Sequence, residues 1–130
     1  MKKFLKSFLA LGLLAGATAS AAELTVYSHR HYDSDAVLFK QFTEETGIKV
    51  NVVKGSADQL IQRLASEGKN SPADVLLTVD AGRLHRAKAA GVLQPVKSKA
   101  LVKNVPASMR DPEGHWYGMT VRSRVIVYAK

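Results

Sequence analysis

The sequence has no cysteine among its 130 residues and only four prolines. The lack of cysteine excludes disulfides, thiolate metal sites, a cysteine nucleophile and the attachment site of a bacterial lipoprotein within this chain. Motifs of common enzymes are missing as well, because no G-x-S-x-G, H-E-x-x-H, P-loop or G-x-G-x-x-G pattern occurs. We therefore expect a binding protein rather than an enzyme. The composition, 46% hydrophobic and 23% charged, is typical of a globular domain.

Long apolar runs are also scarce, and the one that stands out lies near the N-terminus. Three lysines precede a short apolar run from Phe8 to Ala17, and Ala19-Ser20-Ala21 has the small-x-small form of a cleavage site. The run is shorter than the roughly 20 apolar residues that a membrane-spanning helix needs. We therefore interpret residues 1–22 as a secretory signal peptide and expect a periplasmic mature protein.

The chain carries an excess of positive charge that export partly removes. The formal net charge of +8 falls to +5 when the three lysines of the signal segment are cleaved off. The remaining lysines and arginines are dispersed and are not interleaved with aromatic residues in one stripe, as a nucleic-acid surface would need. We therefore expect a solvated surface and no nucleic-acid partner.

The mature sequence alternates between strand and helix patterns. Apolar patterns typical of strands occupy residues 24–28, 48–53, 73–79 and 124–128. Helical patterns occupy residues 35–46, the segment between Ser56 and Gly68, and the segment from Asp80 to Ala90, while residues 101–105 fit a short helix or a loop. Strands that alternate with helices predict an α/β fold with a mainly parallel sheet flanked by helices.

Capping residues support these helix boundaries. Ser56 and Gln59 have the spacing of a capping box, and Asp80 is placed to cap the helix that follows it. Asp33 or Ser34 is expected to cap the helix over 35–46, which Gly47 can end.

The ligand site is expected where the strands end, because open parallel sheets bind ligands at the carboxyl ends of their strands. Three segments leave such ends: residues 29–33, Gly55-Ser56 and residues 78–82. The first holds His31 and Tyr32. A neutral imidazole is a common metal ligand, and a phenolate is a hard oxygen donor. Free tyrosine titrates near ~10, so its ionisation at neutral pH requires a strong cation such as ferric iron. The alternative is a polar loop in which Tyr32 packs and His31 is solvated.

Two arginines near the C-terminal end form a second candidate group. Arg122 and Arg124 flank Ser123, and residues two apart on a strand point to the same side. They can bind an anion or set the field beside a metal. The alternative is that they form ordinary surface ion pairs.

Four stretches of the chain resemble the bacterial periplasmic ferric-iron-binding proteins that serve ABC importers. These stretches cover nearly the whole mature chain and are LTVYSHRHYDSD (24–35), FTEETGIKVNVVKGSADQLIQRLASEG (42–68), SPADVLLTVDAGRL (71–84) and WYGMTVRSRVIVYAK (116–130).

The resemblance implies a periplasmic-binding-protein-like lobe, half of a two-lobed clamshell that holds iron between its lobes. Residues 23–130 would form the N-terminal lobe, truncated before the second lobe is complete. The family's His and Tyr iron ligands match His31 and Tyr32. Val79 stands where another branch has an iron-binding glutamate. The family's arginine near the iron or its companion anion matches Arg124, and with less support Arg122.

The resulting hypothesis is a monomeric periplasmic receptor that binds Fe(3+) as cargo and delivers it to an ABC permease. A synergistic anion such as carbonate would accompany the ion. The alternative is a receptor for an oxyanion or a small organic solute on the same fold. In that case Ser56, Thr78 and the arginines at 122 and 124 would hold the ligand.

Overall fold

A computed structural model describes residues 22–123 and 125–128 of the chain. The predicted signal segment and Arg124 therefore lie outside the described residues, apart from Ala22. The elements, in chain order, are β1 (Glu23–Ser28), α1 (Asp33–Thr46), β2 (Lys49–Lys54), α2 (Ala57–Glu67), the short 3-10 helix η1 (Gly68–Asn70), β3 (Val75–Leu77), α3 (Ala81–Ala89), α4 (Lys99–Asn104) and the 3-10 helix η2 (Ala107–Met109).

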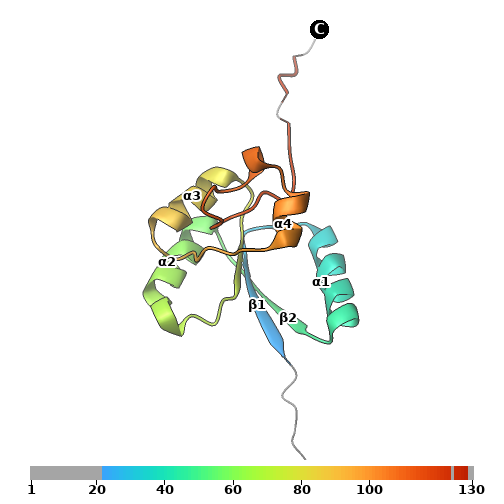
Figure 1. The fold of residues 1–130 in the computed structure, drawn as a ribbon, viewed down its shortest axis with the longest axis vertical. Coiled ribbons are helices and arrows are strands. Elements are labelled where there is room, and N and C mark those ends of the chain that lie inside the picture. Colours follow the sequence, from blue (N-terminus) through green and yellow to red (C-terminus); the bar gives the residue numbers. More distant parts are fainter. Residues whose placement is uncertain (1–21, 124, 129–130) are drawn as a thin grey trace, which may run out of the picture.

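The three strands form one parallel sheet in the order β2-β1-β3. Helix α1 lies on one side of this sheet, while α2 and α3 lie together on the other (Figure 1). The parallel α/β architecture predicted from the alternating patterns is therefore confirmed. This arrangement brings the loops that follow β1 and β3 to the same edge of the sheet, because adjacent parallel strands end on the same side.

The core lies on the side of the sheet covered by α2. The side chain of Tyr27 is fully buried there and packs in one cluster with Leu60 and Leu64 of α2. The Tyr27 hydroxyl donates a hydrogen bond to the Glu67 carboxylate at 2.9 Å, and the Arg63 guanidinium lies 4.9 Å from its ring centroid. Burial is the main cause that raises the pKa of Tyr27.

Several local signals are confirmed. Ser56 and Gln59 form a complete capping box at the start of α2, and the Asp80 carboxylate accepts a hydrogen bond from the backbone N–H of Arg83 at the start of α3. Gly47 ends α1 with a φ of 71°, in the left-handed region that glycine adopts without steric cost.

Two boundary predictions are wrong. The N-cap residue of α1 is Tyr32, which makes no capping hydrogen bond through its side chain, and neither Asp33 nor Ser34 caps the helix. Instead, Asp33 lies within the first turn, where its negative charge favours the positive end of the helix dipole. The strand expected over 73–79 is shorter, because only Val75–Leu77 pair with β1.

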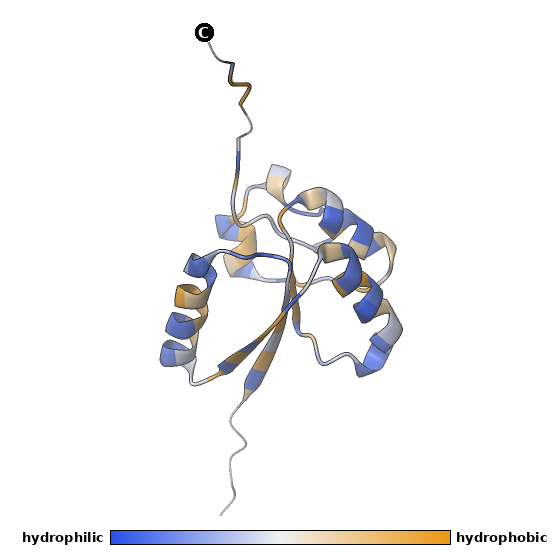
Figure 2. Cartoon of the chain, turned by 180° about the vertical axis from the view of Figure 1, so that it is seen from behind, coloured by the Kyte–Doolittle hydropathy of each residue, from blue (hydrophilic) through white to orange (hydrophobic). Residues whose placement is uncertain are grey.

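The strand predicted over 124–128 is also wrong for its described residues. Residues 125–128 form no strand, and Ile126 is 97% exposed. Figure 2 shows this apolar segment extending away from the rest of the molecule. Apolar and β-branched residues favour a strand only where a neighbouring strand and a packing surface are present, and the described part of this segment has neither.

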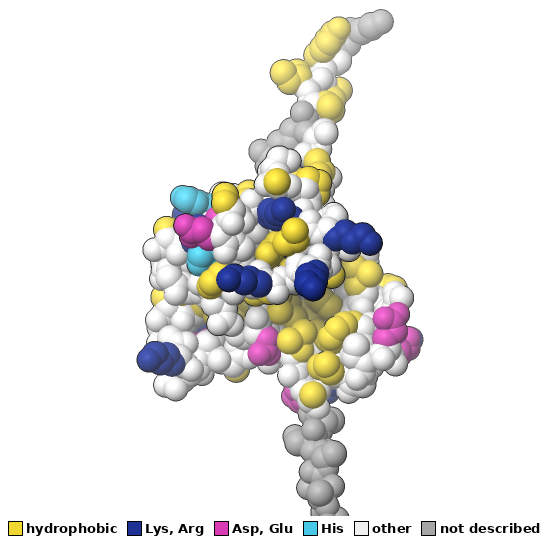
Figure 3. All heavy atoms as spheres, in the orientation of Figure 1, with side chains coloured by type: hydrophobic (Ala, Val, Ile, Leu, Met, Phe, Trp, Pro, Cys, Tyr) yellow, Lys and Arg dark blue, Asp and Glu magenta, His cyan; other side chains and the backbone are white. Residues whose placement is uncertain are grey.

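The outer side of the sheet, next to α1, is less well covered. Within α1, Val37 and Leu38 are 66% and 61% exposed, and no residue of this helix is buried. Figure 3 shows apolar side chains gathered over β2 and beside α1, where Val52 is also exposed. None of the helices in the described ranges has the length and apolar character that a bilayer crossing requires.

Candidate metal site

The loop after β1 is fixed by contacts within the loop and with the first turn of α1. The Ser28 hydroxyl accepts a hydrogen bond from the Arg30 backbone N–H at 3.1 Å. The Arg30 guanidinium forms a two-point ion pair with the Asp35 carboxylate, with N–O distances of 2.8 and 2.9 Å. Both side chains are largely buried, and the hydrogen bond from Arg30 is the main cause that lowers the pKa of Asp35. This pair ties the loop to the first turn of α1.

The two predicted metal ligands lie next to each other on this loop. The rings of His31 and Tyr32 are stacked, with centroids 5.2 Å apart and an angle of 26° between their planes. Both residues are exposed to solvent. The Arg30 guanidinium also lies 4.9 Å from the Tyr32 ring centroid, in the geometry of a cation–π contact. The imidazole and the phenol are therefore accessible on one short segment.

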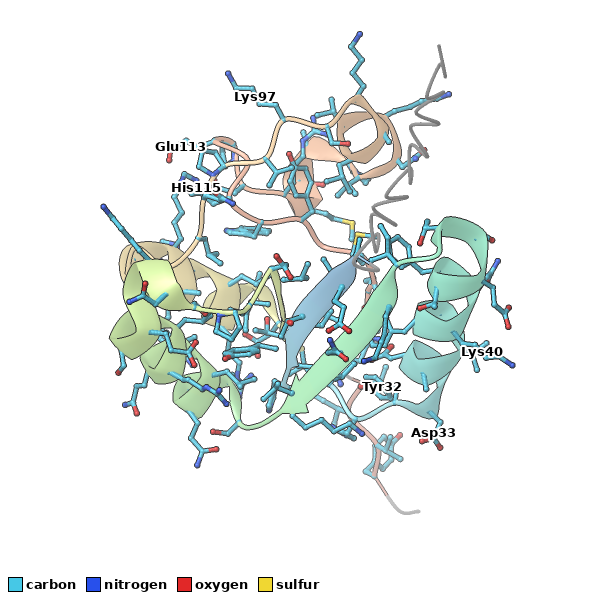
Figure 4. The ribbon with its side chains drawn as sticks, turned by 90° about the horizontal axis from the view of Figure 1, so that it is seen from below. Tyr32, Asp33, Lys40, Lys97, Glu113 and His115 are labelled. Carbon is cyan, nitrogen blue, oxygen red and sulfur yellow. The ribbon has the colours of Figure 1, made fainter. Side chains whose placement is uncertain are left out.

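Arg122 joins this loop to the loop after β3. One nitrogen of its guanidinium donates to the Tyr32 hydroxyl oxygen, and another donates to the Val79 carbonyl, both at 3.1 Å. These residues line an open hollow of about 270 Å³ together with Arg30 and Thr120. Figure 4 shows Tyr32 at the start of α1, beside the loops that form this edge.

The structure thus brings together some of the predicted site residues and not others. Tyr32 and Arg122 are in direct contact, and the segment from Thr78 to Gly82 contributes Val79. The Gly55-Ser56 turn does not line the hollow among the described residues, and the Ser56 hydroxyl accepts the capping hydrogen bond of α2. The sequence interpretation missed the role of Arg30. Its only local signal was an acidic residue five positions later, at the start of a helix.

A second group of potential ligand atoms lies elsewhere. The ligand atoms of Asp111, Glu113 and His115 are within 4.8 Å of one another. The Lys88 ammonium, however, lies 2.8 Å from both carboxylates, and its hydrogen bond is the main cause that lowers the pKa of Asp111. A cation of the protein itself therefore occupies this position. In Figure 4, Glu113 and His115 lie far from Tyr32, so this cluster is a separate structural ion-pair network.

Comparison with known proteins gives related sequences with consistent names. The chain is 53% identical over 117 residues to iron uptake protein A1 of Synechocystis, covering 90% of this chain and 32% of that protein. It is 33% identical to the major ferric iron-binding protein of Neisseria gonorrhoeae, covering 98% of this chain and 39% of that protein. The chain therefore spans about a third of the length of these relatives. Their names describe iron binding and uptake rather than an enzymatic reaction.

Solved structures show the same likeness. A Trichodesmium protein in complex with iron and citrate ligands superposes with a TM-score of 0.73 at 54% identity, over 75% of this chain and 31% of that protein. The ferric binding protein of Campylobacter jejuni superposes with a TM-score of 0.71 at 48% identity, over 72% of this chain and 30% of that protein. A family model described as bacterial extracellular solute-binding protein matches residues 30–130. The predicted resemblance is confirmed, and the chain belongs to the bacterial extracellular solute-binding protein family.

Proposed function

We propose that this chain is the first lobe of a periplasmic receptor that binds ferric iron and delivers it to an ABC permease. The proposal is supported by the iron-related names of relatives that are 33–53% identical to this chain over the aligned residues. In this proposal His31 and Tyr32 bind the ion, a second lobe supplies further ligands, and the receptor acts as a monomer. The sequence pattern of a signal peptide, residues 1–22, supports the periplasmic location.

One observation carries the assignment: an imidazole and a phenol stack side by side on a loop that is anchored by a largely buried ion pair. A phenolate is a hard anionic donor and suits a small cation of high charge. Imidazole binds many transition metals, including iron. Because the loop is fixed by Arg30 and Asp35, both donors are held at the open edge of the sheet before the metal arrives.

The mechanism is capture rather than catalysis. Fe(3+) enters at the open edge and binds the Tyr32 oxygen and a nitrogen of His31, while the phenol proton of Tyr32 passes to solvent water. Phenolates from the second lobe then surround the ion and close the site. Arg124 offsets the negative charge of several phenolates or binds a synergistic anion such as carbonate. Arg122 is less suited to this role, because its guanidinium already donates to the Tyr32 hydroxyl oxygen and to the Val79 carbonyl.

The test is metal analysis combined with visible spectroscopy of the protein carrying both lobes. We expect one ferric ion per molecule and a tyrosinate-to-iron charge-transfer band. Tyr32→Phe removes one phenolate, so the charge-transfer band should weaken. The loss of an outer-shell partner of a metal ligand lowers metal affinity roughly tenfold to hundredfold. The loss of a ligand itself should therefore lower iron affinity by at least that factor. Tyr128→Phe is the matched control, because Tyr128 is exposed and lies far from Tyr32 in the sequence. We expect it to leave the charge-transfer band and the iron affinity unchanged.

The alternative solute receptor makes the opposite prediction. If the ligand were an oxyanion held by arginines, the Tyr32→Phe variant would retain its ligand affinity and the wild-type protein would stay colourless with ferric ion at neutral pH. Either result would contradict the iron assignment.

A further inference from the structure

Arg122 is bound to the oxygen atom that the proposed function assigns to iron. Its guanidinium donates to the Tyr32 hydroxyl oxygen and to the Val79 carbonyl, each at 3.1 Å. The two acceptors lie 90 and 43 positions before it in the chain, on the loops that follow β1 and β3. The arginine therefore bridges both loops at the mouth of the candidate site.

The charge of Arg122 is not compensated in the way that the charge of Arg30 is. Arg30 also lies beside Tyr32, but its charge is matched by the Asp35 carboxylate. The ion pairs formed within the described residues, 22–123 and 125–128, do not include Arg122, and its hydrogen-bond acceptors are a tyrosine hydroxyl and a backbone carbonyl. Asp80 lies on the same side of the hollow, but its carboxylate is already paired with Arg83. A full positive charge thus faces the Tyr32 oxygen.

We propose that Arg122 is a placeholder cation, which holds the Tyr32 oxygen while the site is empty and is displaced when ferric iron binds. Two cations that approach one oxygen repel each other, and the repulsion is larger for a triply charged ion. Before the phenolates of a second lobe arrive, little negative charge is present to offset this repulsion. Arg122 must therefore release Tyr32 at the first encounter with iron. This inference rests on the proposed function of His31 and Tyr32.

The placeholder role and an anion-binding role predict opposite effects on iron affinity when Arg122 is removed. If Arg122 only bound a companion anion, its loss would weaken iron binding. If it competes with iron for Tyr32, its loss removes a hydrogen bond that iron has to break. A hydrogen bond of this kind at an exposed site contributes about fivefold in an equilibrium constant. Arg122→Gln should therefore bind iron about fivefold more tightly and faster.

The experiment follows the charge-transfer band by stopped flow, in the protein carrying both lobes, with ferric nitrilotriacetate as the iron source. Three variants are compared with wild type: Arg122→Gln, Arg122→Lys and Arg63→Gln. We expect faster association only for Arg122→Gln, because lysine keeps the charge. Arg63→Gln is the control, since it removes an arginine that contacts a different tyrosine, the buried Tyr27, at 4.9 Å from its ring centroid.

A second measurement separates competition at Tyr32 from a general change in charge. In a Tyr32→Phe background, the gain from Arg122→Gln should disappear, because the shared oxygen is gone. An Arg122→Gln variant that binds iron as slowly as wild type, or more weakly, would overturn the placeholder role while the coloured wild-type complex still supported the iron receptor. A colourless wild-type protein would instead refute the proposed function itself.

Discussion

Replacing Gly55 with alanine should destabilise the fold, and the size of the effect can be worked out from one contact. Gly55 follows β2, and a Cβ atom added there would lie 3.2 Å from both Cγ and Cδ2 of Leu60. That separation is shorter than an ordinary carbon–carbon contact of about 3.5–4.0 Å. Leu60 is only 3% exposed and packs against Tyr27 and Leu64, so it has little room to move.

Two opposing effects decide whether Gly55→Ala lowers or raises the free energy of unfolding. Overpacking of a core costs about 1–3 kcal/mol. A glycine-to-alanine change also restricts the unfolded chain, which stabilises the fold by about 0.4–1 kcal/mol. At the midpoints of these two ranges the net result is a loss of about 1 kcal/mol in the free energy of unfolding. For a domain of this size, each kcal/mol lowers the melting temperature by about 4–8 °C.

Thermal unfolding followed by circular dichroism measures this loss. Gly82→Ala is the control, because its new Cβ would meet only the Asp80 carboxylate oxygen, at 3.3 Å, on an exposed side chain. Alanine is also the better helix former by about 0.8–1 kcal/mol, so Gly82→Ala should not lower the melting temperature. A Gly55→Ala variant as stable as wild type would show that the Leu60 cluster yields easily, contrary to the packing argument.

Three further predictions concern local structure and pH. Ser56→Ala removes one half of the capping box and should lower the free energy of unfolding by about 1 kcal/mol, measured by urea unfolding; an unchanged midpoint would contradict the cap. Gly118→Ala would place a Cβ atom 2.8 Å from the Met109 carbonyl oxygen, so it should reduce the protection of the Gly118 amide in hydrogen exchange. The pKa of Asp111 is held below its ordinary value by Lys88; its stabilising effect is therefore complete above pH about 4 and is lost as the pH falls further. Asp111→Asn should lower stability at neutral pH and flatten the acid limb of the pH–stability curve; an unaltered acid limb would refute this.

The features that could be predicted from the sequence depend on residues close together in the chain. The capping box of α2 joins residues three positions apart, and the left-handed turn at Gly47 depends on a single residue. Their geometry is therefore set by local chemistry. The loop with His31 and Tyr32 could be located in the same way, because the end of a parallel strand can be read from a short apolar pattern.

The contacts that were missed join distant residues or depend on a neighbour. The bond between Arg122 and Tyr32 spans 90 positions, and Lys88 reaches Asp111 across 23. No periodicity in the sequence indicates such pairs. The apolar pattern over 125–128 likewise predicts a strand correctly only when a partner strand lies alongside, which a local pattern cannot specify.

The ion pair between Arg30 and Asp35 bears on how quickly a ligand can be held once it arrives. It closes a loop of only five positions and places a histidine and a tyrosine at its tip. A loop closed in this way has few accessible conformations, so less conformational entropy is lost when its tip becomes ordered around an ion. Removing this ion pair, for example with Asp35→Ala, would keep both His31 and Tyr32 in the chain. It would still slow the ordering of their side chains around the ion.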